Sequence, residues 1–163
     1  MYLTCPVKDC LMKILMVCLG NICRSPLAQG IMAEKIRKND LDWTVDSAGT
    51  GNWHVGEQPD PRSVQTAHRY GLDISDQRAR QLRPQDLREF DLILAMDTSN
   101  YRHILEIAPE GTAHKVEMIL NYVHPGRNQS VPDPYWNDDG FEEVYHLLDQ
   151  ATDRLIEACL AED

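Results

Sequence analysis

The sequence predicts an α/β protein of one domain, in which helices cover both faces of a parallel sheet. The chain has 163 residues, and 42% of them are hydrophobic, which suits one compact domain with its own core. Short apolar segments alternate with amphipathic ones, and this order is typical of a parallel sheet. Ligands of such folds bind where strands end, so the turns that follow the predicted strands are candidate sites.

The first elements predicted are a strand, a helix and a second strand. Residues 13–17 are apolar and rich in branched side chains, so we expect a buried strand. Ser25 and Pro26 are typical of an N-cap and a first helical position, and the helix should end near Asp40. A second strand is expected over residues 43–47, followed by a loop.

The middle of the chain continues the alternation. Asp60 and Pro61 should start a helix that ends at Gly71. The remaining elements expected here are a short helix over 84–89, a strand over 91–96, a helix over 100–107 and a short strand over 115–119.

The two ends of the chain differ in character. Residues 124–139 are rich in Pro, Asn and Asp and predict a long loop, and residues 141–160 predict a long amphipathic helix. Residues 1–11 show no clear period. We interpret them as a loose N-terminal extension, with Met12 as an alternative start, before a domain over residues 12–163.

Charge and composition exclude several classes of protein. Acidic residues number 26 against 16 basic ones, a net charge of −10, which disfavours binding to nucleic acid or to an anionic membrane. The apolar run over 11–17 is too short to span a bilayer. The five cysteines have no scaffold-like spacing, and Cys5 and Cys10 have no matching Cys/His pair for a metal. We therefore expect reduced thiols, a cytoplasmic protein and no metal.

The segment Cys18-Leu19-Gly20-Asn21-Ile22-Cys23-Arg24-Ser25 lies between the first predicted strand and helix. Backbone N–H groups of such a loop, together with the start of a helix, form an anion site. The glycine spacing and the Lys-Ser/Thr ending of an ATP-type phosphate loop are missing. The segment therefore predicts a different kind of phosphate-binding loop.

The side chains of this loop indicate phosphoryl transfer to sulfur. A cysteine in such a cradle is favoured as the thiolate, so Cys18 is the candidate nucleophile. Arg24 can bind two phosphoryl oxygens and follow them through the transition state. The Ser25 hydroxyl can donate to the Cys18 sulfur, and Asn21 tolerates the left-handed backbone that a tight loop needs.

Cleavage of a phosphoester also needs an acid for the leaving oxygen. Asp133, in the sequence Val-Pro-Asp-Pro-Tyr-Trp, is the best candidate, because the flanking prolines stiffen the loop. Tyr135 and Trp136 could flank an aryl substrate. On local evidence alone an Asp-Pro pair is an ordinary turn, so this assignment stays open at this point.

With these motifs the chain resembles the low-molecular-weight protein tyrosine phosphatases. The resemblance runs from about Lys13 to the last predicted helix. It rests on the segments CLGNICRS, VDSAGT, WHVG, DPR, ARQL and DPYW and on residues 90–100. It implies a single Rossmann-like domain with a four-stranded parallel sheet. It also implies hydrolysis of phosphotyrosine in proteins without a cofactor or metal, and activity on small aryl phosphates in vitro.

The resemblance implies roles for individual residues. Cys18 would form a phosphocysteine, Arg24 would bind the phosphoryl group, and Asp133 would act first as acid and then as base. Cys23 would form a reversible disulfide with Cys18. Asn21, Ser25 and Ser47 would shape the loop, and Leu19, Ile22, Trp53, Tyr135 and Trp136 would line the slot for the aromatic ring.

The sequence departs from the family pattern at two positions. Many members have a histidine in the network supporting the loop where this chain has Gln77. An amide can still form hydrogen bonds, so we expect the loop to hold. Position 136 is Trp where tyrosine is common, which leaves Tyr135 as the candidate for phosphorylation.

Three rival functions share parts of this pattern. A thiol-linked arsenate reductase needs resolving cysteines near residues 78–98, and the sequence has none there. A phosphoarginine phosphatase of the same fold has threonine at the position of Ile22. A non-catalytic phosphate-binding module would lack the nucleophile, the arginine or the acid, and Cys18, Arg24 and Asp133 are all present.

Overall fold

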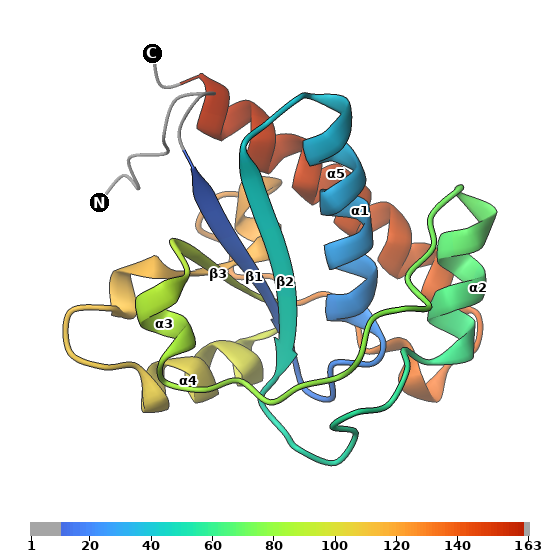
Figure 1. Cartoon of the computed structure of the whole chain (residues 1–163), viewed down its shortest axis with the longest axis horizontal. Helices are drawn as coiled ribbons and strands as arrows, with labels where there is room; N and C mark the ends of the chain where they lie inside the picture. Colours follow the sequence, from blue (N-terminus) through green and yellow to red (C-terminus); the bar gives the residue numbers. More distant parts are fainter. Residues whose placement is uncertain (1–10, 162–163) are drawn as a thin grey trace.

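A computed structural model describes residues 11–161 of the chain. The predicted N-terminal extension lies, except for Leu11, outside the described residues, so the domain boundary stays a prediction. Figure 1 shows a central sheet between two groups of helices.

The sheet has four parallel strands in the order β2-β1-β3-β4, which confirms the fold class predicted from the sequence. The strands are β1 (Met12–Cys18), β2 (Trp43–Gly49), β3 (Leu92–Ala95) and β4 (Val116–Met118). β1 is central, and its buried apolar side chains pair in register with β2 and β3. β1 therefore ends at Cys18 in the middle of the carboxyl edge of the sheet.

The helices form two layers (Figure 1). One apolar cluster joins the sheet to α1 (Arg24–Lys38), α2 (Pro61–Arg69) and α5 (Gly140–Leu160). A second cluster joins the opposite face to α3 (Asp86–Glu89) and α4 (Thr98–Ile107). Burial on both faces explains why β1 and β3 are almost continuous apolar runs.

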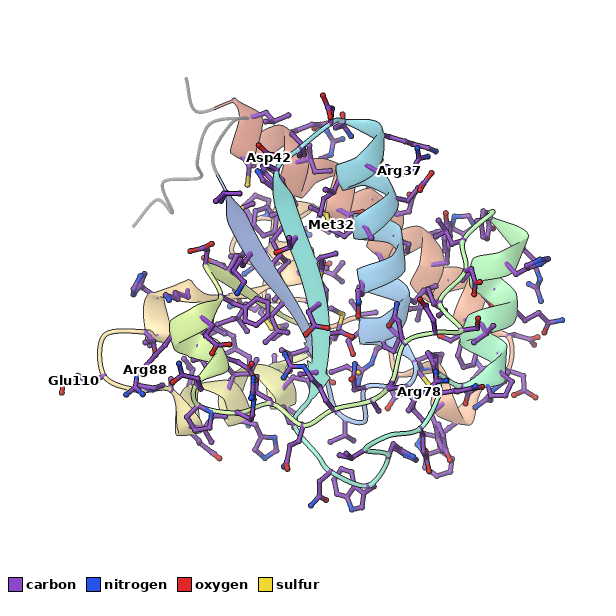
Figure 2. The ribbon with its side chains drawn as sticks, viewed as in Figure 1. Met32, Arg37, Asp42, Arg78, Arg88 and Glu110 are labelled. Atoms are coloured by element: carbon purple, nitrogen blue, oxygen red, sulfur yellow. The ribbon has the colours of Figure 1, made fainter. Side chains whose placement is uncertain are left out.

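Individual side chains follow the same layering. Figure 2 shows Met32 on the side of α1 that faces the sheet, whereas Arg37 of the same helix points outward. Met32 is fully buried and Arg37 is exposed, as expected for an amphipathic helix between core and solvent. α1 thus holds the loop that precedes it against the core.

Several boundaries differ from those predicted. α4 begins at Thr98 rather than Asn100, because the Asp97 carboxylate accepts from the Asn100 N–H and the Asn100 side chain accepts from the Asp97 N–H. The predicted loop over 124–139 contains a short 3₁₀ helix, η3 (Pro134–Trp136), capped by Asp133. Two further 3₁₀ turns, η1 (Ala113–Lys115) and η2 (Ile119–Tyr122), flank β4 and shorten it.

No helix within residues 11–161 is long and apolar enough to cross a membrane. Cys18 and Cys23 are free thiols, whereas Cys159 takes part in a disulfide. The expectation that all cysteines are reduced is therefore wrong at Cys159. The positions of the cysteines in the sequence do not by themselves predict such a disulfide.

Candidate active site

The loop from Cys18 to Ser25 curls tightly between β1 and α1. Asn21 has a φ of 57°, the left-handed conformation predicted for it. The backbone of Gly49, at the end of β2, lies so close that a side-chain carbon there would come within 2.8 Å of the Leu19 carbonyl oxygen. Thr50 N–H donates to the Cys18 carbonyl at 2.9 Å, which fastens the loop to the segment after β2.

A buried polar network joins the loop to α1, β2 and the segment around Arg80. Asn21 Nδ2 donates to Ser25 Oγ at 2.8 Å and to Ser47 Oγ at 2.9 Å, and Asn21 Oδ1 accepts from Arg80 N–H at 3.0 Å. Ser47 Oγ in turn donates to Gln29 Oε1 at 2.6 Å. Because all these groups are paired, the loop is held in one shape.

This network also directs the Ser25 hydroxyl toward sulfur. Cys18 Sγ lies 3.0 Å from Ser25 Oγ. Since Ser25 Oγ accepts a hydrogen bond from Asn21, its own proton is available for the Cys18 sulfur. The hydroxyl of Ser25 is therefore placed to donate to the Cys18 sulfur, and its effect on that sulfur stays a prediction.

Arg24 is 2% exposed and is fixed by two acceptors. Its Nη1 donates to Asp97 Oδ2 at 2.8 Å and to the Val131 carbonyl at 3.0 Å. Its Nε is buried and has no hydrogen-bond partner among the described residues. Nε and Nη2 therefore form an edge of the guanidinium with no hydrogen bond among the described residues, which suits two oxygens of one phosphoryl group.

The charge of Arg24 is maintained by its surroundings. Burial opposes the charged form, but Cys18, the hydrogen bond to Asp97 and the carboxylates of Asp97 and Asp133 outweigh it and raise the pKa of Arg24. Arg24 thus stays a cation inside the protein.

Asp133 lies across the pocket from the loop. Its carboxylate oxygen Oδ2 is 3.8 Å from Arg24 Nη2, and Oδ1 accepts from Tyr135 N–H at 3.1 Å. The side chain is 39% exposed, so it reaches both solvent and pocket. Asp133 and Cys18 are 115 positions apart in the chain, and the fold brings both to one cavity.

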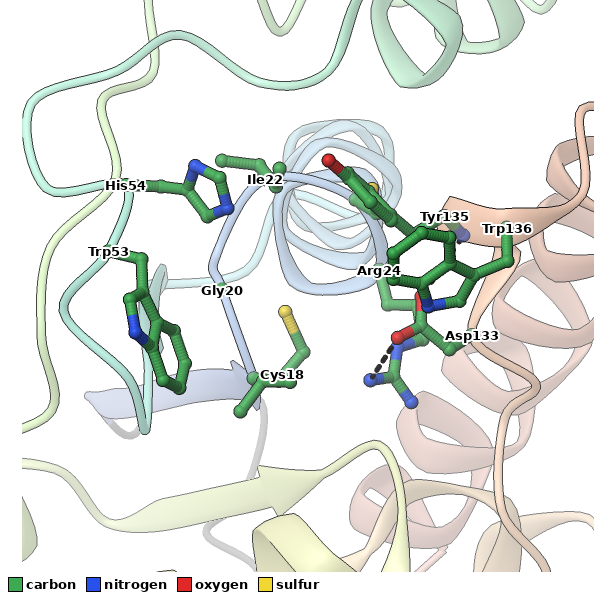
Figure 3. Close-up of a pocket in the computed structure, with 11 residues that line it drawn as sticks. Cys18, Gly20, Ile22, Arg24, Trp53, His54, Asp133, Tyr135 and Trp136 are labelled. Carbon is green, nitrogen blue, oxygen red and sulfur yellow. Dashed lines mark hydrogen bonds and ion pairs between the residues drawn. The ribbon is translucent and has the colours of Figure 1, made fainter.

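The cavity has a volume of about 280 Å³. In Figure 3 the Cys18 thiol points into it, with Trp53 and His54 on one side and Asp133, Tyr135 and Trp136 on the other. It is lined by Cys18, Leu19, Gly20, Ile22, Cys23, Arg24, Trp53, His54, Asp133, Tyr135 and Trp136. An open slot with aromatic walls and a cationic floor suits an aryl phosphate.

Arg62 anchors the segment that carries Asp133. Its guanidinium pairs with Asp60 at 2.9 Å and with Asp138, and it lies over the rings of Tyr135 and Phe141. The hydrogen bonds to Asp60 and Asp138 raise the pKa of Arg62, so this cation is permanent. The acid segment is thereby tied to the start of α2.

Cys23 also lines the cavity, and it is a buried free thiol. Burial raises the pKa of Cys23, and the negative charges of Asp60, Cys18 and Asp133 raise it further. Cys23 is therefore a neutral thiol at physiological pH.

The structure places most of the predicted site residues together, with one difference. Gln77 Nε2 donates to the Pro26 carbonyl at 3.1 Å, at the start of α1, and Gln77 Oε1 is buried without a partner among the described residues. Its place in the network with Asn21 and Ser47 stays a prediction. The acceptor that the structure gives to Ser47 is Gln29.

Sequence reasoning did not identify three residues of the site. Asp97 and Gln29 fix Arg24 and Ser47, and His54 lines the cavity. Asp97 carries a usable signal, because a polar residue directly after a buried parallel strand lies at the ligand-binding edge. Gln29 and His54 carry none, because a helix glutamine and a loop histidine are usually surface residues.

Within the described part of the chain, no group of three or more His, Cys, Asp or Glu side chains is arranged to hold a metal ion. The parallel sheet with a cysteine–arginine loop at its carboxyl edge is the arrangement expected of an enzyme of the phosphatase class.

Comparison with known proteins gives the family. The family model of low molecular weight phosphotyrosine protein phosphatases matches residues 13–163. The phosphatase of that description from Schizosaccharomyces pombe is 42% identical over 140 residues, covering 83% of this chain and 89% of its own. The human one is 37% identical over 137 residues, covering 82% and 86%. The chain therefore belongs to the low molecular weight phosphotyrosine protein phosphatase family, a family of protein-tyrosine-phosphatases.

Solved structures agree on the fold. YfkJ from Bacillus subtilis has a TM-score of 0.87 at 34% identity, covering 95% of this chain and 98% of its own. A structure described as a Drosophila arginine phosphatase also has a TM-score of 0.87, at 32% identity, covering 93% and 100%. Because two different names share this fold equally well, the residues of the site must decide the substrate.

Proposed function

We propose that the protein hydrolyses phosphotyrosine in proteins through a phosphocysteine intermediate and without a metal. The observation that carries the proposal is the convergence of Cys18, Arg24 and Asp133 in one cavity. The chemistry divides into two displacements at phosphorus, each with one of these side chains in a distinct role.

In the first displacement the Cys18 thiolate attacks phosphorus and the bond to the tyrosine oxygen breaks. Asp133 gives its proton to the leaving oxygen, and the Nε–Nη2 edge of Arg24 holds two phosphoryl oxygens. In the second, Asp133 takes a proton from water, the water oxygen attacks phosphorus, and Cys18 leaves as the thiolate. Ser25 stabilises the sulfur as it leaves. Arg24 and the loop supply the positive charge, so no metal is assigned a role.

Ile22 and the aromatic walls support phosphotyrosine as the substrate. A branched apolar side chain beside Trp53 and Tyr135 offers an aryl ring apolar contact, whereas a guanidinium would gain no polar partner from Ile22. The arsenate reductase alternative lacks its resolving cysteines in the stretch 78–98. The reaction needs Cys18 as a free thiol, which favours the cytoplasm as the compartment.

The test uses purified protein, p-nitrophenyl phosphate and an excess of chelator. We expect turnover that chelator leaves unchanged and that Cys18→Ser lowers by at least about 10⁴-fold, since the nucleophile is lost. A matched Cys23→Ser variant should keep its activity. Loss of turnover with chelator, or its survival in Cys18→Ser, contradicts the mechanism. Faster release of phosphate from phosphoarginine than from phosphotyrosine contradicts the substrate.

A further inference from the structure

A second cavity lies next to the catalytic one and shares a wall with it. Its volume is about 230 Å³, and Leu19 and Trp53 line both cavities. On the far side of this wall the second cavity is formed by Leu82 and by the last turns of α4, with Ile107 as the apolar contact. The remaining lining residues are Thr50, Gly51, Gln81, and His103 and Glu106 of α4.

The dividing wall is open to solvent and lies close to the backbone after β2. Trp53 is 68% exposed, yet its ring rests on the backbone of Gly51: a side-chain carbon at Gly51 would lie 1.9 Å from Trp53 Cζ3. Only glycine permits this contact. In Figure 3 the indole lies beside the Cys18 side chain. The ring therefore forms part of the boundary of both cavities.

The thickness of the indole sets the distance between groups that occupy the two cavities. Apolar groups in contact with the two faces of one ring each lie about 3.5 Å from it, so the two groups are about 7 Å apart. In an extended peptide the side chains of residues i and i+2 point to the same side, and at about 3.3 Å per residue they are about 6.6 Å apart. The two distances match for residues that are two positions apart.

We propose that this second cavity binds a large apolar side chain located two residues from the phosphotyrosine of an extended substrate peptide. The inference rests on the proposed function, because it needs a phosphotyrosine in the catalytic cavity. Leu19, Trp53, Leu82 and Ile107 provide the apolar surface, and the volume accommodates one leucine or phenylalanine side chain. The site gives the enzyme a sequence preference that small aryl phosphates cannot report.

The experiment compares phosphotyrosyl peptides that differ at one position. Each has leucine or alanine two residues before or two residues after the phosphotyrosine, and kcat/KM is measured beside p-nitrophenyl phosphate. One leucine peptide should exceed its alanine counterpart by about tenfold, the usual effect of one apolar side chain in a pocket. Ile107→Asn should remove this preference and leave p-nitrophenyl phosphate turnover unchanged.

Leu105→Asn is the matched control, since Leu105 and Ile107 belong to the same helix and are 36% and 37% exposed, but Leu105 does not line the cavity. It should retain the leucine preference. Equal rates on leucine and alanine peptides, with p-nitrophenyl phosphate still hydrolysed, overturn this inference alone. If Ile107→Asn changes the mass of the protein assembly in solution but not the peptide preference, the cavity is a self-association surface. That result also overturns the inference. Absence of any phosphatase activity defeats the proposed function and the inference together.

Discussion

The two segments that meet in the catalytic cavity are held in different ways. The phosphate-binding loop is buried, and its polar groups are paired by Asn21, Ser25 and Ser47. The acid segment is open to solvent, with Trp136 86% exposed, and it is held mainly from outside by Arg62. In the proposed mechanism, phosphate binding thus depends on the core, whereas proton transfer depends on a surface segment and its anchor.

Arg24→Lys, in the buried loop, should lower the activity more than any substitution in the acid segment. Lysine keeps a charge but cannot offer a two-pronged edge while also bonding to Asp97 and Val131. We expect kcat/KM for p-nitrophenyl phosphate to fall by about 10³-fold, the upper range for loss of a transition-state donor. Lys35→Arg, on the same helix and outside the cavity, is the control. A loss below tenfold would show that the loop binds phosphate without this side chain.

Asp133→Asn should have a large effect that depends on the leaving group. Phenyl phosphate needs protonation of its leaving oxygen, so its kcat should fall by about 10²-fold or more. p-Nitrophenol leaves readily as an anion, so its ester should be much less affected. Asp138→Asn is the control, because Asp138 is on the same segment but does not line the cavity. Equal slowing of both esters would remove Asp133 as the acid.

These two residues also show what the sequence could and could not predict. Cys18 and Arg24 are six positions apart in a loop between a strand and a helix, so local spacing alone implies one anion site. The contact of Arg24 with Asp97 and that of Arg62 with Tyr135 each join residues more than 70 positions apart. Such contacts depend on how the layers pack, which no local pattern encodes.

Gln77 also shows a limit of prediction from the sequence, since its described contact differs from the one expected. The family pattern placed it in the loop network, whereas its described hydrogen bond is to the Pro26 carbonyl. The network partner on that side is Gln29, which accepts from Ser47. Gln29 lies on α1, and no local pattern of the sequence pointed to it as an acceptor in this network. The fold was predictable because it follows from the order of apolar segments, but this exchange was not.

Arg62→Gln should have a moderate effect and act only on the acid segment. The change removes two carboxylate pairs and the contacts with the rings of Tyr135 and Phe141, so the segment carrying Asp133 loses its anchor. We expect kcat for phenyl phosphate to fall about fivefold, in line with a partly exposed cation–π contact. Inhibition by inorganic phosphate, which reports the buried loop, should not change.

Arg69→Gln is the control for this prediction, because Arg69 is on the same helix and pairs with Glu142 away from the cavity. A parallel loss of phosphate affinity in Arg62→Gln would mean that the two segments are not independent. Such a result would contradict the comparison on which the prediction rests.

Cys23→Ser should have the smallest effect on turnover, with kcat within twofold of the original. Burial and the nearby negative charges raise the pKa of Cys23, so it stays a neutral thiol and does not compete with Cys18 as nucleophile. Its role should emerge after peroxide treatment. Peroxide converts the Cys18 thiolate to a sulfenic acid, and the Cys23 thiol then forms a disulfide with it and releases water.

Dithiothreitol should therefore restore activity to the peroxide-treated original protein but not to Cys23→Ser, in which Cys18 oxidises further. Activity before and after reduction measures this, and the mass of the peptide containing Cys18 identifies the oxidised form. Full recovery of Cys23→Ser would mean that the raised pKa keeps the thiol from reacting at all. The buried loop would then protect its nucleophile through geometry alone, and Cys23 would be a packing residue of the cavity wall.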